Sequence, residues 1–364
     1  MELQRYRWSK SLFCSYFSTQ FIKMPKIYWN DSRNLLKKLT LRRAWNYYVL
    51  VLSYFWSKWT GKLVVWGKPF SISVEPTTSC NLRCPECPSG LRAFTRETGM
   101  LEKEFFTKTI DALSKDLLYL VFYFQGEPYL NPKFLDMVAY ASKKGIYTAT
   151  STNAHYLTDA VCEKTILSGL DRMIISIDGT TQETYESYRI GGKLDKVIEG
   201  AKRMAEWKKK LKSSTPHLIF QFLVVRHNEH QIDEVYKLAE DIGIDEVRLK
   251  TAQVYEYENG NDLIPHQEKY SRYKKNSDGT FSIKNKMVNS CWRMWMGCVI
   301  TWDGLVVPCC FDKDATHKLG SLQQQSFHDL WRGAPYTQFR KSLLKSRSEI
   351  DICKNCTEGT KVWA

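Results

Sequence analysis

Six short apolar runs alternate with longer amphipathic segments along the middle of the chain, and this rhythm limits the possible folds most strongly. The runs are rich in β-branched and aromatic residues, and they occupy residues 70–75, 117–124, 146–152, 172–178, 217–225 and 245–250. The intervening segments, such as 132–145 with glycine at its end, repeat apolar residues at helical spacing. Such alternation predicts a parallel sheet whose strands are joined by helical crossovers.

Six β/α units of this length fit an α/β fold, an open and partial (β/α)6 barrel of the TIM type. We assign residues 69–255 to this barrel and 1–68 to a helical N-terminal extension. Residues 256–286 are polar and turn-rich, which is typical of a linker. They would lead to a small C-terminal module, residues 287–364, which contains a predicted hairpin with Asp303-Gly304 at its turn.

The N-terminal extension concentrates positive charge and aromatic residues. Residues 1–68 hold 13 Lys and Arg against Glu2 and Asp31, so they carry +11 of the net charge of +14. Their longest uncharged run has 14 residues (44–57), whereas a helix that spans a bilayer needs about 20. Two interpretations follow. The helices pack their aromatics on the main domain, or they lie on an anionic membrane or an acidic partner. Charge alone would also suit nucleic acid.

Three cysteines follow the first predicted strand in a CxxxCxxC spacing: Cys80, Cys84 and Cys87. They therefore lie at the C-terminal mouth of the predicted barrel, where such folds place their chemistry. A structural zinc site closes with four ligands, and no fourth cysteine is near. Three thiolates on a four-iron cluster would leave one iron open to a substrate or cofactor.

The cysteines also indicate the cellular compartment. There are eleven, an odd number, and most cluster in short spacings. The first 20 residues lack the continuous apolar region of a signal peptide. We therefore expect reduced, metal-binding thiols in a cytoplasmic protein, which would be membrane-peripheral if the extension contacts lipid. Cys14 and Cys162 lie outside any cluster spacing and are expected to be ordinary buried thiols.

The cysteine motif resembles the signature of the radical S-adenosylmethionine (SAM) enzymes. The resemblance implies that Cys80, Cys84 and Cys87 hold a 4Fe–4S cluster whose open iron chelates SAM. In that family an electron from the reduced cluster cleaves SAM to methionine and a 5′-deoxyadenosyl radical, which abstracts hydrogen from the substrate. We expect an electron donor of the flavodoxin or ferredoxin type.

Five residues are expected to bind SAM, four of them at strand ends and the last in the segment after the fourth strand: Gly126, Glu127, Asn153, Ser176 and Arg189. The first two resemble the family's GGE motif, which meets the SAM amino group, although Gln125 stands where a glycine is usual. Relatives with auxiliary clusters carry a similar S-x-D-G and a downstream Tyr-Arg that serve SAM. Outside this context each match would be an ordinary turn, cap or surface residue.

The C-terminal module carries a second group of cysteines: Cys291, Cys298, Cys309, Cys310, Cys353 and Cys356. Their layout resembles the SPASM/twitch extension of radical SAM enzymes, which houses auxiliary 4Fe–4S clusters. The resemblance implies one auxiliary cluster, held by Cys291, Cys309, Cys353 and Cys356. Cys310 in place of Cys309, and a part for Cys298, stay open. Zinc is the alternative metal, since four thiolates suit it equally well.

An auxiliary cluster near the radical could accept an electron, which predicts an oxidative modification of a peptide or protein. Dehydrogenation of a small sugar or aminocyclitol-like molecule is the alternative, because the cysteine spacing resembles the twitch-type aminocyclitol dehydrogenase. Oxidation requires a base for the substrate proton. Sulfatase-maturing relatives place a carboxylate where this chain has Cys310, so we nominate Asp312 instead. A zinc-stabilised nucleic-acid-binding protein is the alternative of another class, and only the charge favours it.

Overall fold

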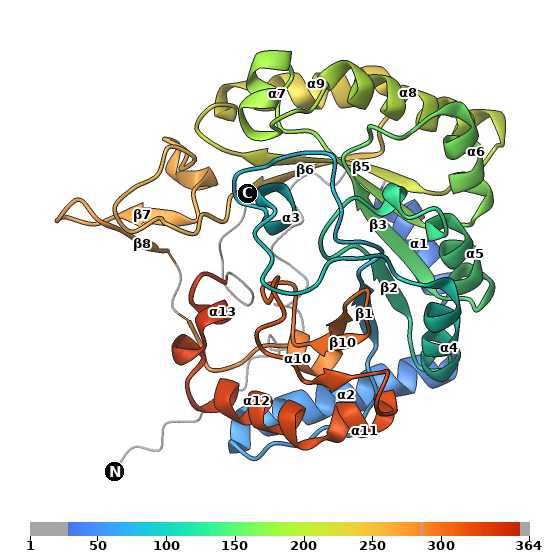
Figure 1. Cartoon of the computed structure of the whole chain (residues 1–364), viewed down its shortest axis with the longest axis vertical. Helices are drawn as coiled ribbons and strands as arrows, with labels where there is room; N and C mark the ends of the chain where they lie inside the picture. The colour runs from blue at the N-terminus through green and yellow to red at the C-terminus, as the bar shows by residue number, and fades with distance from the viewer. Residues whose placement is uncertain (1–27, 285–286, 357–364) are drawn as a thin grey trace, which may run out of the picture.

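The protein is described from a computed structural model, over residues 28–284 and 287–356 (Figure 1). Cys14 and the ends of the predicted extension and C-terminal module lie outside the described residues. The barrel strands are β1 (Ser71–Val74), β2 (Tyr119–Phe122), β3 (Tyr147–Thr152), β4 (Arg172–Ser176), β5 (His217–Val224) and β6 (Glu246–Thr251). They pair in parallel, in chain order. The predicted open barrel of six β/α units is therefore confirmed.

Helices cover the outer face of this sheet (Figure 1). They are α4 (Lys103–Leu113), α5 (Phe134–Lys143), α6 (Asp159–Leu167), α7 (Gln182–Tyr188), α8 (Leu194–Lys210) and α9 (Ile232–Ile242). Their buried residues recur at helical spacing, as Val197, Ala201 and Met204 do in α8. One apolar stripe per helix thus packs on the strands.

The strands separate an apolar outer face from an open inner face. In β1, Ile72 and Val74 are buried in the main core, whereas Ser71 and Ser73 are partly exposed. The same alternation holds in β2. Because successive strand residues point to opposite faces, the partly exposed residues face the barrel interior, which is left accessible for a site.

The predicted C-terminal hairpin joins the barrel sheet. It consists of β9 (Gly297–Ile300) and β10 (Leu305–Val307), with Gly304 at φ 84° in its turn, and β11 (Gly320–Ser321) follows. β9 pairs with β1 in parallel, so the sheet has nine strands. The C-terminal helices are α10 (Arg293–Met296), α11 (Phe327–Arg332), α12 (Ala334–Lys345) and α13 (Asp351–Lys354). The predicted linker contains its own hairpin, β7 (Tyr273–Lys275) and β8 (Phe281–Ile283).

Two N-terminal helices, α1 (Tyr28–Lys37) and α2 (Leu41–Thr60), are anchored to the barrel by polar contacts. Asp31 of α1 bonds to Tyr147 and Arg172, which begin β3 and β4, so α1 lies at the barrel end opposite the cysteine loop. Arg43 of α2 donates to the carbonyl oxygens of Ser114, Lys144 and Gly145. No helix in the described part of the chain is long and apolar enough to cross a membrane.

The β1–β9 contact depends on a missing side chain, which gives a first prediction. A Cβ atom at position 297 would lie 1.5 Å from the carbonyl oxygen of Ser71. We expect Gly297→Ala to separate the two strands and to lower the free energy of unfolding by about 3 kcal/mol. Urea denaturation would measure this loss.

Gly243→Ala is the matched control. Gly243 has φ +85° but nothing within 4 Å of an added Cβ, so only the backbone cost of about 1–2 kcal/mol applies. Equal losses in the two variants would contradict the close-approach explanation.

Candidate active site

A loop with three cysteines leaves the C-terminal end of β1. The backbone amide of Cys87 donates to the carbonyl oxygen of Cys84 at 3.3 Å, and the short helix α3 (Pro88–Leu91) begins directly after Cys87. The amide of Arg83 donates to the carbonyl oxygen of Ile190 at 3.0 Å, which ties the loop to the far side of the mouth. The three thiols line a pocket of about 540 Å³.

The same pocket gathers every residue that the sequence assigned to the first cluster and to SAM. Its walls include Cys80, Cys84, Cys87, Gly126, Glu127, Asn153, Ser176 and Arg189. These residues come from the ends of the first four strands and from the segment after α7. Parallel strands bring their carboxyl ends to one edge, which explains why residues up to 109 positions apart meet here.

Gly126 and Glu127 lie directly against the cysteine loop. Gly126 has φ +72°, and an added Cβ would lie 2.2 Å from the carbonyl oxygen of Thr77, so only glycine fits. The Glu127 side chain is held by the end of β3, since it accepts from Thr152 Oγ1 at 2.7 Å and from the Asn153 amide at 2.8 Å. Burial raises the pKa of Glu127 to about 7 despite these bonds.

Cationic and amide groups surround the cysteine thiols. Arg189 pairs with Asp178 at 2.5 Å, and its Nη1 lies 3.6 Å from the sulfur of Cys84. The Asn153 side-chain amide lies 3.9 Å from the sulfur of Cys80. Burial nevertheless raises the pKa of Cys80 to about 11 and that of Cys84 above its usual value. Thiolates here would need further positive charge, which iron would supply.

The three thiols supply the donor type that iron–sulfur clusters use, and they line one pocket. Three thiolates on a four-iron cluster would leave one iron without a protein ligand.

The sequence analysis did not single out seven further residues that line the pocket: Leu82, Ser89, Gly90, Tyr123, Ser151, Thr152 and Gln221. Ser89 Oγ accepts from the Gly126 amide at 2.9 Å and donates to the Gln125 side chain at 3.4 Å. Gln125, which stands where a glycine is usual, accepts from the thiol of Cys87 at 3.7 Å as well, so it connects two site segments. The signal for Gln221 was present, because it is the one polar residue within the apolar run 218–225.

A second set of cysteines meets in the C-terminal module. Cys309, which follows β10, has its pKa raised well above the usual value by burial and by the nearby Cys310, Cys291 and Cys356. Cys353 and Cys356 are both 7% exposed, at α13 and just after it. The four cysteines that the sequence grouped together therefore lie in one region.

Arg347 supplies positive charge to this second set. It is fully buried, and it donates to the sulfur of Cys356 at 3.3 Å and to the carbonyl oxygen of Ser290 at 3.1 Å. A buried cation beside thiols favours their ionised form, which iron ligation requires. Sequence reasoning had no way to single out Arg347 among 53 basic residues.

The two cysteines that were left open have different surroundings. Cys298 is buried in β9 beside Tyr336 and Arg340, and burial raises its pKa to about 12. Cys310 is exposed and lines a pocket of about 340 Å³ with Cys309 and Arg293. These positions favour Cys309 over Cys310 as the fourth ligand.

Asp312, which the sequence nominated as the base, is held in a buried hydrogen-bonded turn. Its side chain is only 1% exposed. One carboxylate oxygen accepts from the amide and the hydroxyl of Thr316, both at 2.8 Å, and the other accepts from the His317 amide at 2.9 Å. The carboxylate therefore caps a turn, and it lines neither described pocket.

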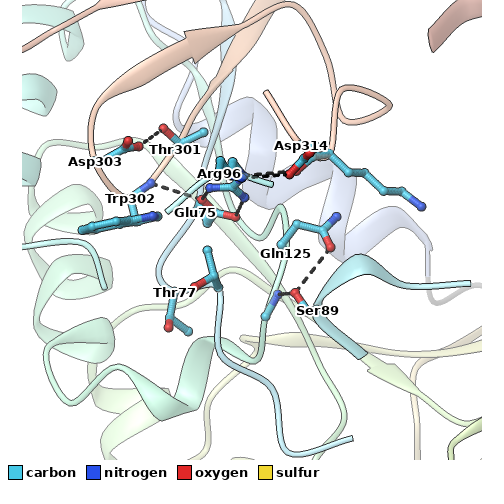
Figure 2. A network of polar contacts seen from close by, with 12 residues as sticks. Glu75, Thr77, Ser89, Arg96, Gln125, Thr301, Trp302, Asp303 and Asp314 are labelled. Atoms are coloured by element: carbon cyan, nitrogen blue, oxygen red, sulfur yellow. Dashed lines mark hydrogen bonds and ion pairs between the residues drawn. The ribbon is translucent and has the colours of Figure 1, made fainter. Parts of the chain in front are cut away.

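A buried ion pair connects the cysteine loop to the C-terminal hairpin (Figure 2). Glu75, directly after β1, is fully buried. Its carboxylate accepts hydrogen bonds from both terminal nitrogens of Arg96, at 2.5 and 2.9 Å. The Trp302 amide, in the hairpin turn, donates to Glu75 at 3.3 Å. Asp314 accepts from the Thr95 amide at 2.9 Å. The segment around Arg96 thus holds the two cysteine-bearing parts together.

Two family matches agree with this arrangement. Residues 74–247 match the radical SAM superfamily, and residues 291–357 match SPASM, an iron–sulfur cluster-binding domain. The chain belongs to the radical SAM superfamily and carries a C-terminal SPASM domain. The resemblance inferred from the motifs is therefore confirmed, together with the cofactor classes, SAM and iron–sulfur clusters. The match removes the zinc-stabilised nucleic-acid-binding alternative.

Relatives of similar length cover most of the chain. The tungsten-containing aldehyde ferredoxin oxidoreductase cofactor-modifying protein of Pyrococcus furiosus is 27% identical over 314 residues, 78% of this chain and 86% of that protein. The AdoMet-dependent heme synthase of Methanosarcina barkeri is 23% identical over 323 residues, 79% and 88% of the two chains.

Solved structures share the fold. AnSMEcpe with bound AdoMet has a TM-score of 0.60 at 17% identity, over 80% of this chain and 91% of that chain. The same protein was also solved with AdoMet and the Cp18Cys peptide, at a TM-score of 0.55.

The Glu75–Arg96 pair gives a second prediction. Arg96→Met leaves a carboxylate buried without its cation, so we expect unfolding free energy to fall by about 3–5 kcal/mol in chemical denaturation. Adding Glu75→Gln should restore part of the loss, because the buried charge is then gone. The control is Arg203→Met, whose exposed pair with Glu199 should contribute less than about 1 kcal/mol. An Arg96→Met loss as small as this control would contradict a structural role for the pair.

Proposed function

We propose that this protein binds a 4Fe–4S cluster through Cys80, Cys84 and Cys87 and binds SAM in the pocket beside them. The observation that carries the proposal is the convergence of these three thiols with the five predicted SAM-binding residues on one pocket. When bound and reduced, the cluster would supply the electron that splits SAM into methionine and a 5′-deoxyadenosyl radical.

The pocket residues have complementary tasks in this proposal. Glu127 would accept from the SAM ammonium group, which in turn would favour the ionised carboxylate over the protonated form. Arg189, oriented by Asp178, would meet the SAM carboxylate. Gly126 would let the backbone approach the ligand, and Asn153 and Ser176 would offer hydrogen bonds at the strand ends.

The second cysteine set supports an oxidative reaction. One auxiliary cluster would be held by Cys291, Cys309, Cys353 and Cys356, so that each iron has a protein ligand. Arg347 would offset the negative charge of this cluster. Such a cluster can take an electron from a substrate radical but cannot ligate the substrate. A flavodoxin- or ferredoxin-type donor in the cytoplasm would reduce the first cluster.

A peptide or protein is the substrate class we favour. AnSMEcpe, which shares the fold over 80% of this chain, has been solved with a peptide. A small molecule is the second candidate. The relatives from Pyrococcus furiosus and Methanosarcina barkeri, which match 78% and 79% of this chain, are named for modifying a cofactor and for making heme. The general base stays unassigned, because Asp312 caps a turn.

The first-cluster assignment predicts a defined iron loss. Anaerobically reconstituted protein should hold about eight irons, and replacing Cys80, Cys84 and Cys87 with alanine should leave about four. Formation of 5′-deoxyadenosine should then stop, because no iron is left to chelate SAM. Cys162→Ala, within the core of α6, is the control and should keep both iron and cleavage. SAM cleavage in the triple variant would disprove the assignment.

The auxiliary assignment predicts uncoupling. Replacing Cys353 and Cys356 with alanine should remove about four irons, spare SAM cleavage and abolish oxidation of the substrate. Iron content, 5′-deoxyadenosine and modified substrate would be measured together. Cys310→Ala should keep all three, since Cys310 is exposed beside the proposed ligand Cys309. Full product yield without the auxiliary cluster would overturn the oxidative role.

A further inference from the structure

Helix α2 packs its polar side inward. Its buried residues are Arg43, Asn46, Leu50, Ser53 and Ser57, of which only Leu50 is apolar. Several of the polar ones form hydrogen bonds within the N-terminal segment: Asn46 bonds to the backbone of Lys68, and Ser57 accepts from the Val64 amide at 2.9 Å. A surface helix normally buries its apolar stripe instead.

The opposite side of α2 exposes a stripe of large apolar residues. Their spacing of three or four places them on one helix face, and their exposed fractions run from 40% to 92%: Leu41, Trp45, Tyr48, Leu52, Trp56 and Trp59. We call this set the α2 stripe. In Figure 1 the helix runs along the lower edge of the molecule.

Neighbouring residues extend the α2 stripe into a patch. Trp66 is 50% exposed and its ring lies 6.4 Å from that of Trp56. Of the 19 large apolar side chains exposed in the described residues, 11 lie within residues 28–68. Exposed apolar residues scattered singly need no explanation, but a contiguous patch marks an interaction surface.

The charge around the patch indicates what covers it. Residues 28–68 expose basic side chains at Arg33, Lys37, Arg42, Lys58 and Lys62. Their only acidic residue, Asp31, is buried against Arg172. The partner must therefore accept tryptophan and tyrosine rings while carrying negative charge. A second copy of this chain would bring the same positive charge to the contact.

We propose that the α2 stripe lies on an anionic lipid surface. Tryptophan and tyrosine favour the membrane–water interface, and basic residues at its edge gain from anionic headgroups. Because α1 and α2 are anchored to the barrel by Asp31 and Arg43, the whole enzyme would be held at the membrane. This proposal does not depend on the identity of the substrate.

Vesicle co-sedimentation of the full chain tests the proposal. Vesicles of phosphatidylcholine with phosphatidylserine should bind the wild-type protein, and phosphatidylcholine alone should bind it clearly less. Raising the salt concentration should weaken the binding. The combined variant Trp45→Gln, Trp56→Gln and Trp59→Gln should bind these vesicles with an affinity lower by a factor of about ten. Leu167→Gln with Tyr236→Gln, at exposed positions on α6 and α9, is the control and should bind like wild type.

Two further measurements keep the test decisive. Iron content and SAM cleavage of the stripe variant should match wild type, since the changed residues are exposed and line neither described pocket. Light scattering should give the same molecular mass for the wild-type protein and for the stripe variant. The proposal is overturned if wild type ignores phosphatidylserine vesicles, if the stripe variant binds them equally, or if the stripe proves to form a dimer.

Discussion

The pairing of β9 with β1 organises the rest of the structure. The first barrel strand carries the cysteine loop, and its free edge is covered by a strand that lies 220 residues or more further along the chain. Gly297 permits this pairing, because any side chain there would collide with Ser71. The hairpin is thereby positioned beside the cysteine loop, and Glu75 and Arg96 lock the two parts together at the strand end.

The two cysteine sites differ in the groups that surround them. The first opens into a pocket whose walls carry both an acid, Glu127, and a cation, Arg189, as a zwitterionic ligand would require. In the second, the buried Arg347 donates to the sulfur of Cys356. A pocket with both charges suits a small zwitterionic cofactor, whereas a buried cation beside thiols offsets the negative charge of a cluster held by thiolates.

The N-terminal helices combine features of both interpretations that the sequence allowed. α1 and α2 do pack on the barrel, where Asp31, Arg42 and Arg43 make polar contacts, but many of the aromatic rings stay outside. Some rings pack inward, such as Tyr54 against Trp292 and Trp295. The helices thus join the enzyme body on one side and leave an apolar face with basic edges on the other.

The sequence by itself determined what depends on local pattern. Alternating apolar periodicity predicted the six strands in order, and the CxxxCxxC spacing after the first strand located the radical SAM site. The residues at strand ends came together as expected, because parallel strands present their carboxyl ends at one edge. Only the tertiary structure decided features that depend on distant contacts. β9 pairs with β1, and Arg347 is buried beside the cysteines. The Asp312 carboxylate accepts hydrogen bonds from Thr316 and His317. The orientation of α2 belongs to this second group, because its local pattern predicts burial of the apolar side, and the contacts of Arg43 with the distant backbone of Ser114 and Lys144 reverse it.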